Sequence, residues 1–210
     1  MGGRDVTSFV ADAKKRIEDG IRFPAGVYAV FAGAAEAQSL AQQELLLSSV
    51  ITGIAIVLLL GIAFHNTRNL ILVLANIPFA LTGGVLAIFV SGGWLTLGSL
   101  VGLVTLFGIS TRNSIMMISH FEHLVAVEGE SWSLETALRG ASERLLPILM
   151  TALVAGLGLL PIAIGTGDPG REIEGPMAIV ILGGLITSTA LNLLVLPTLA
   201  VRYGRFEGSL

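Results

Sequence analysis

The sequence predicts an all-α membrane protein with five transmembrane helices, and three observations lead to this fold class. Hydrophobic residues make up 53% of the 210-residue chain and charged residues only 13%, whereas about a quarter of the residues in a soluble domain are charged. Five apolar segments reach the roughly 20 helical residues that are needed to cross the hydrocarbon core of a bilayer. The 26 glycines are typical of helices that pack closely in lipid.

Residues 1–44, which precede the first span, have the pattern of water-soluble structure. Apolar side chains recur at every third or fourth position from Val6 to Ile17, which predicts an amphipathic helix. Pro24–Gly26 ends this pattern, and Val27–Phe31 predicts a short strand. Because one helix and one strand bury too little apolar surface to fold alone, we expect this segment to be the end of a larger external domain.

The helix bundle is predicted to occupy residues 45–202. Its spans are Leu45–Phe64, Leu70–Val90, Leu95–Ser119, Leu145–Gly165 and Met177–Val201. The longest connection is the segment 120–144, and a short tail follows at 203–210.

Basic residues are concentrated at one set of span ends, where the sequence has Arg68, Arg139, Arg144, Arg202 and Arg205. The opposite short loops contain only Arg171. Since basic loops stay in the cytoplasm, we expect the tail to be cytoplasmic and residues 1–44 to lie outside.

The connection 120–144 carries a second amphipathic pattern. Leu134, Leu138 and Leu145 share one side of a predicted helix, and Ser133 is a suitable N-cap. This helix either lies along the inner membrane surface or is an ordinary connecting helix, and the second interpretation is favoured.

The same connection begins with two imidazoles and a carboxylate within one helical turn, which belong to His120, His123 and Glu122. Such a pair of imidazoles is a weak ligand set for a metal. Polar side chains are also expected where a span leaves the membrane. We therefore interpret these residues as interface residues and expect no metal site.

The main candidate for a functional residue is Arg112, about 10 Å inside the cytoplasmic end of the third span. Thr105 and Ser119 lie seven residues before and after it, nearly two helical turns, so the three side chains share a face. Asn113 extends this polar surface. Such a face packs against protein or a water-filled path, and this interpretation is favoured over an arginine that only reaches for the headgroups.

The fourth span repeats the pattern with Arg144 and Thr151, which are also seven residues apart. Taken alone, Thr151 would bond its own helix backbone. Together the two residues predict a second polar stripe with a cation at the cytoplasmic end. In the fifth span, Asn192 is a lone amide that we expect to bond a neighbouring helix.

None of the 15 aspartates and glutamates lies inside a predicted span. An arginine at membrane depth needs an anion. Arg112 therefore reaches lipid phosphates, or its countercharge comes from helices outside this sequence. The second alternative agrees with the incomplete external domain, and both observations indicate a fragment.

Five long motifs occur in order along nearly the whole chain: GRDVTSFVADA, NIPFALTGGVLA, FGISTRNSIMMISHFEHL, ERLLPILMTAL and EIEGPMAIVILGGLITSTALNLLVLP. They resemble the resistance-nodulation-division (RND) transporters, and most of all their heavy-metal efflux branch of the copper/silver and cobalt/zinc/cadmium kind. The resemblance implies the last five of twelve spans of a proton-driven exporter in the bacterial inner membrane. Residues 1–44 would end its periplasmic porter domain. The implied partners are the missing amino-terminal part, two further copies in a homotrimer, a periplasmic adaptor and an outer-membrane channel.

The resemblance also implies roles for the polar residues of the two stripes. Arg112 and the following Asn113 match the basic residue and its neighbour on the tenth span, which respond when acidic residues on the missing fourth span change protonation. Arg144 and Thr151 match the polar residues of the eleventh span. Leu146 stands where the family usually has a second arginine, which leaves Arg144 as the only cation at this helix entrance.

The sequence is compatible with three functions. The carboxyl-terminal part of a metal-cation exporter is preferred, because the EIEGPMAIVILGGL stretch favours the metal branch. The alternatives are a multidrug member of the same superfamily and a membrane scaffold that transports nothing. The sequence contains no nucleophile–base arrangement, phosphate loop or nucleotide site, so we expect neither enzymatic activity nor a cofactor. The net charge of −3 gives no indication of nucleic acid as a partner.

Overall fold

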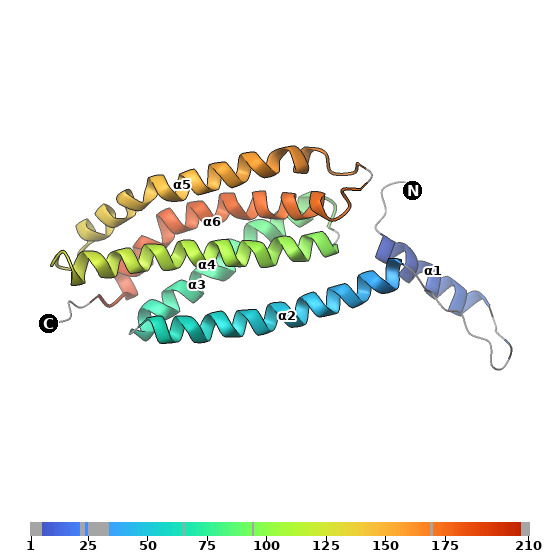
Figure 1. The fold of residues 1–210 in the computed structure, drawn as a ribbon, viewed down its shortest axis with the longest axis horizontal. Helices are drawn as coiled ribbons and strands as arrows, with labels where there is room; N and C mark the ends of the chain where they lie inside the picture. Colours follow the sequence, from blue (N-terminus) through green and yellow to red (C-terminus); the bar gives the residue numbers. More distant parts are fainter. Residues whose placement is uncertain are drawn as a thin grey trace.

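The computed structural model describes residues 6–21, 24, 34–64, 66–93, 95–168 and 170–206. Within these ranges the chain forms six α-helices (Figure 1): α1 Val6–Gly20, α2 Ala34–Ala63, α3 Thr67–Val90, α4 Leu97–Ala126, α5 Leu134–Ile164 and α6 Glu174–Tyr203. The predicted amphipathic helix near the amino terminus is present as α1. The strand predicted at Val27–Phe31 lies outside the described residues.

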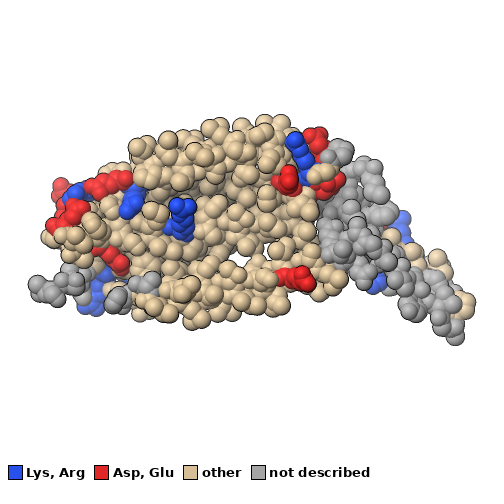
Figure 2. All heavy atoms as spheres, viewed as in Figure 1, with Lys and Arg blue, Asp and Glu red and all other residues tan. Residues whose placement is uncertain are grey.

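Helices α2 to α6 are all long and apolar enough to cross a membrane. This confirms the predicted all-α membrane fold. Figure 2 shows that acidic and basic side chains gather towards the two ends of the bundle and are sparse across its middle. Such a distribution fits an apolar belt between two polar surfaces.

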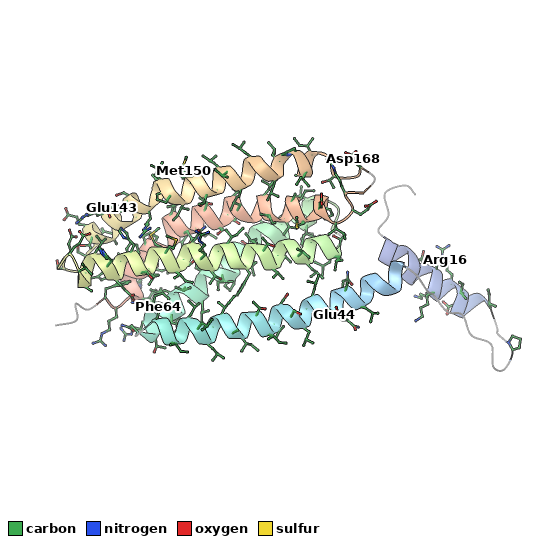
Figure 3. All side chains as sticks on the ribbon, in the orientation of Figure 1. Arg16, Glu44, Phe64, Glu143, Met150 and Asp168 are labelled. Carbon is green, nitrogen blue, oxygen red and sulfur yellow. The ribbon has the colours of Figure 1, made fainter. Side chains whose placement is uncertain are left out.

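The end of the bundle at which α4 finishes and α5 begins is called the link end below. Because the helices run up and down, α2 and α6 also finish at the link end and α3 begins there. Figure 3 shows Phe64 and Glu143 near this end and Asp168 at the opposite end.

Three helices, α3, α4 and α6, carry most of the buried residues of the bundle. These helices contact one another pairwise, whereas α5 lies mainly on α6, and α2 has few contacts with α3 and α4. The apolar side chains of α2 and α5 are largely exposed. Met150 on α5 is an example, and its side chain points away from the bundle in Figure 3. Two of the five helices therefore present apolar faces that only lipid or further protein would cover.

Small residues let α3 and α6 approach closely in the half of the bundle away from the link end. A Cβ atom added to Gly83 would lie 2.6 Å from the carbonyl oxygen of Gly183 on the facing helix. Beside this contact, the hydroxyl of Thr187 donates a hydrogen bond to the carbonyl oxygen of Ala80 at 3.2 Å. The close packing expected of glycine-rich membrane helices thus occurs at a defined site.

The link between α4 and α5 is shorter than the predicted connection 120–144. Helix α4 continues to Ala126, and α5 starts at Leu134 after the N-cap Ser133, whose Oγ accepts a hydrogen bond from the backbone N–H of Thr136 at 3.2 Å. The helix predicted in the connection is the first part of α5, which continues without a break to Ile164. Helix α5 continues through Pro147.

The chain after α6 is packed against the link end. The ring of Phe206 lies 4.1 Å, centroid to centroid, from Trp132 and 5.9 Å from Phe121. The backbone of Arg205 exchanges hydrogen bonds with Asn69 at the start of α3: the Asn69 amide nitrogen donates to the Arg205 carbonyl at 3.2 Å, and the Arg205 N–H donates to the Asn69 Oδ1 at 3.2 Å. The first residues of the predicted tail therefore belong to the folded bundle.

Candidate functional site

Helix α4 places the predicted polar stripe on an uncovered face. Thr105, Arg112 and Ser119 are all exposed, and Asn113 beside them is half-buried. Helical geometry makes the first three residues share a side, and the packing of α4 against α3 and α6 leaves that side open. The hydroxyl of Thr105 donates to the carbonyl oxygen of Val101 at 2.8 Å, within its own helix.

Arg112 makes no ion pair with any carboxylate among the described residues. Several described carboxylates near the two ends of the bundle have other partners, such as His120 for Glu143 and Arg171 for Asp168. A guanidinium is always charged in proteins, so Arg112 presents a fixed positive charge on an open face of a helix that is long enough to span the membrane.

The second predicted stripe lies on α5. Arg144 is half-buried, and its Nε atom is buried without a hydrogen-bond partner among the described residues. Thr151 is exposed, and its hydroxyl donates to the carbonyl oxygens of Ile148 at 2.9 Å or Pro147 at 3.1 Å. Leu146 on the same helix is exposed. No hydrogen bond or ion pair between described residues joins this stripe to Arg112.

The polar residues at the end of α4 take part in a network of charges across the link. His120 Nε2 lies 2.8 Å from a carboxylate oxygen of Glu143 on α5, and His123 Nδ1 lies 3.7 Å from Glu128 in the link. The guanidinium of Arg139 contacts three carboxylates, those of Glu128, Glu130 and Glu143. Glu122 turns to the other side and accepts a hydrogen bond from the Asn69 amide at 2.8 Å.

These contacts give the cluster at the end of α4 an ordinary structural role, which is to hold α4, the link and α5 together. Across the residues that the structure describes, no three histidines, aspartates or glutamates gather as metal ligands would.

At the opposite end of the bundle, backbone N–H groups of Glu172 itself and of Gly170 donate to the Glu172 carboxylate and hold its pKa below the usual range.

A second polar group on α4 was not found from the sequence. Ser114 is completely buried between α3 and α6, where its Oγ lies 2.7 Å from the amide nitrogen of Asn76 and 3.0 Å from Oδ1 of Asn192. The expected hydrogen bond between Asn192 and a neighbouring helix is thus present, with Asn192 Oδ1 as the acceptor. Its partners, Asn76 and Ser114, were not predicted from the sequence. The sequence signal that could have indicated this contact is an asparagine inside each of two different spans, Asn76 and Asn192.

Comparison with known proteins identifies the family. Residues 1–203 match the model of the AcrB/AcrD/AcrF family. The chain is 41% identical over 198 residues to the cobalt-zinc-cadmium resistance protein CzcA of Cupriavidus metallidurans, an alignment that covers 94% of this chain and 18% of the relative. It is 31% identical over 203 residues to the cation efflux system protein CusA of Escherichia coli K12, with 92% and 19% covered.

The fold agrees with a solved structure. A crystal structure of a heavy metal efflux pump superposes with a TM-score of 0.71 at 35% identity, over 97% of this chain and 20% of that pump. The chain therefore spans about a fifth of the length of the proteins that it matches. On its sequence and its fold, the chain belongs to the AcrB/AcrD/AcrF family of RND transporters and is similar to the heavy-metal efflux members of that family.

Proposed function

We propose that the chain is the carboxyl-terminal transmembrane part of a proton-driven RND pump that exports heavy-metal cations. The observation that carries the proposal is the open face of α4, which exposes Arg112 with no countercharge among the described residues. The relatives named as cobalt-zinc-cadmium resistance and cation efflux proteins support metal cations as the substrate class.

In this proposal the countercharge of Arg112 is a carboxylate from the amino-terminal part of the pump, facing the open side of α4. When the carboxylate is ionised, it attracts the guanidinium. When it takes up a proton, the attraction is lost and the helices repack. At a separation of 4 Å and an effective dielectric constant near 20, such a pair is worth about 4 kcal/mol, from which the cost of desolvation must be subtracted.

The remaining stripe residues support this exchange of charge. Asn113 and Ser119 extend the polar lining on α4, and Thr105 continues it towards the opposite end. Arg144 and Thr151 supply a second polar lining on α5, whose outer face is also open to further protein. The altered packing of the helices would then drive the porter domain, to which residues 1–44 contribute, through its transport states.

The assembly is part of the same proposal. The link end faces the cytoplasm and residues 1–44 face the periplasm, in agreement with the basic residues near the link end. The pump would act as a homotrimer together with a periplasmic adaptor and an outer-membrane channel. The apolar faces of α2 and α5, which the described residues leave uncovered, provide surface for the amino-terminal part and for lipid.

The test is substitution of Arg112 in a complete pump that contains this chain. We expect Arg112→Ala to abolish growth in the presence of cobalt, zinc, cadmium or copper salts and to stop proton-coupled metal flux in proteoliposomes. Arg112→Lys should retain part of the flux, because lysine keeps the charge. Arg68→Ala, which removes an exposed arginine at the link end, is the matched control and should behave as the parent.

The amount of each variant in the membrane is measured alongside, so that a folding defect is recognised. The proposal is wrong if the Arg112→Ala pump accumulates normally and exports metal like the parent. Loss of export in Arg68→Ala to the same extent would also contradict it, because the effect would then not depend on the position inside the membrane.

A further inference from the structure

The middle of the bundle contains a polar cluster that the proposed function does not use. It consists of Asn76 on α3, Ser114 on α4 and Asn192 on α6, and all three residues have no exposed surface. They are 38, 78 and 116 residues apart along the chain. We call these three residues the polar node.

The hydrogen bonds of the polar node connect three helices at one level. The amide nitrogen of Asn76 donates to the Ser114 hydroxyl at 2.7 Å and to Oδ1 of Asn192 at 2.9 Å, which uses both of its hydrogens. The Ser114 hydroxyl donates either to the Ser110 carbonyl or to the Asn192 Oδ1, each at 3.0 Å. The amide nitrogen of Asn192 is bonded within α6, to the carbonyl oxygen of Ser188 at 2.8 Å.

The stability of the bundle does not by itself explain the polar node. Oδ1 of Asn76 and the hydroxyl of Ser110, one turn from Ser114, are buried without a hydrogen-bond partner among the described residues. Unpaired polar atoms in a buried site are unfavourable, and apolar side chains of the same shape would avoid that cost. Buried polar groups of this kind can serve to select one register of packed helices over others.

The polar node lies back to back with Arg112. Ser114 follows Arg112 by two residues, and at about 100° per residue the two side chains leave α4 in nearly opposite directions, about 200° apart. Ser114 is enclosed by α3 and α6, whereas Arg112 is exposed. A shift of α4 by one residue along its helical path would break the bonds to Asn76 and Asn192. The same shift would turn the guanidinium by about 100°.

The polar node also keeps its bonds at any pH near neutrality, because amides and hydroxyls do not ionise there. No side chain in it is titratable, and its neighbours Ser110 and Ser188 are not titratable either. Protonation of a carboxylate outside the polar node therefore does not by itself remove any of these hydrogen bonds.

We propose that Asn76, Ser114 and Asn192 are positioning residues that fix the rotation of α4 and so determine the direction in which Arg112 is presented. The inference depends on the coupling role of Arg112 in the proposed function. It adds that α3, α4 and α6 move together when the carboxylate that faces Arg112 is protonated. The Arg112 side chain then leaves α4 in the same direction relative to α3 and α6 before and after.

The test compares two identical substitutions on α4 in the complete pump. Ser114→Ala removes a hydroxyl that bonds across helices, and Ser110→Ala removes a hydroxyl that is equally buried, one turn away, but unpartnered. Ser114→Thr retains the hydroxyl and serves as the rescuing variant. The measured quantities are the protein level in the membrane, the Zn²⁺ flux in proteoliposomes, and the dependence of this flux on pH.

We expect Ser114→Ala to accumulate normally but to lose up to about 100-fold in flux, because a misplacement of a reacting group by about 1 Å can cost that much. Its pH of half-maximal flux should move upwards, because a guanidinium that lies farther away stabilises an ionised carboxylate less. Ser110→Ala should match the parent, and Ser114→Thr should recover flux and pH dependence together.

The outcomes separate this inference from the proposed function. If Arg112→Ala stops export while Ser114→Ala keeps the parental flux and pH profile, the polar node has no positioning role and only this inference fails. If Arg112→Ala exports normally, the proposed function fails first. If Ser114→Ala does not accumulate while Ser110→Ala does, the polar node is a folding element, and the inference is overturned in that case as well.

Discussion

The contact between Gly83 on α3 and Gly183 on α6 allows a quantitative prediction for the substitution Gly83→Ala. The added methyl group would lie closest to Oγ1 of Thr187, and 2.6 Å from both the Gly183 carbonyl oxygen and Cγ2 of Thr187. Ordinary contacts between such atoms are about 3.5 Å or longer. The oxygen belongs to the backbone of a packed helix, so the two helices must separate rather than rotate a side chain away.

The expected loss of stability has three parts. Overpacking of a close contact costs about 1–3 kcal/mol. Separation of the helices also weakens the hydrogen bond from Thr187 to the Ala80 carbonyl, which contributes about 1 kcal/mol. Alanine is the better helix former by about 1 kcal/mol, which offsets the lost hydrogen bond. The net destabilisation of Gly83→Ala is therefore about 1–3 kcal/mol.

The assay is unfolding of the purified chain in mixed micelles with increasing SDS, followed by tryptophan fluorescence. Trp132 is packed between Phe121 and Phe206, so its emission reports on the folded bundle. The matched control is Gly53→Ala on α2, where an added Cβ meets nothing within 4 Å. This control should unfold at the same or a higher SDS fraction than the parent. The reasoning is refuted if Gly83→Ala and Gly53→Ala shift the midpoint equally.

Two further substitutions test the link end in the same assay. Phe206→Ala removes a buried ring that contacts Trp132 and Phe121, so we expect a loss of about 3 kcal/mol and a red shift of the folded-state emission; an unchanged spectrum would show that the chain after α6 does not pack there. Ser133→Ala removes the N-cap bond to the Thr136 N–H and should cost about 1 kcal/mol, whereas Ser133→Asp should restore the midpoint. Equal midpoints for Ser133→Ala and the parent would exclude a capping role.

Several features of the molecule followed from short-range sequence patterns. The five spans could be predicted because the hydrophobic length of a helix is a local property. Helix periodicity grouped Thr105, Arg112 and Ser119 on one face, and the structure leaves all three exposed. The N-cap at Ser133 was predicted for the same reason, since its hydrogen-bond partner is three residues away. Each of these features depends on residues within a few turns of one another.

The connection 120–144 shows where a local pattern is insufficient. The apolar stripe at Leu134 and Leu138 correctly predicted a helix, but periodicity does not say whether that helix ends before the next span. In the structure it joins α5 as one helix from Leu134 to Ile164.

What the sequence alone determined is thus the five spans, the helix near the amino terminus, the cap at Ser133 and the face of α4 that carries Arg112. Only the tertiary structure decided which faces meet: that Ser114 is enclosed by Asn76 and Asn192, that Gly83 touches Gly183, and that Phe206 returns to Trp132. The physical reason is that helical periodicity depends on neighbours along the chain, whereas these contacts join residues that are dozens of positions or more apart. Their partners are selected by the packing of whole helices, and a single sequence does not encode that choice in any short pattern.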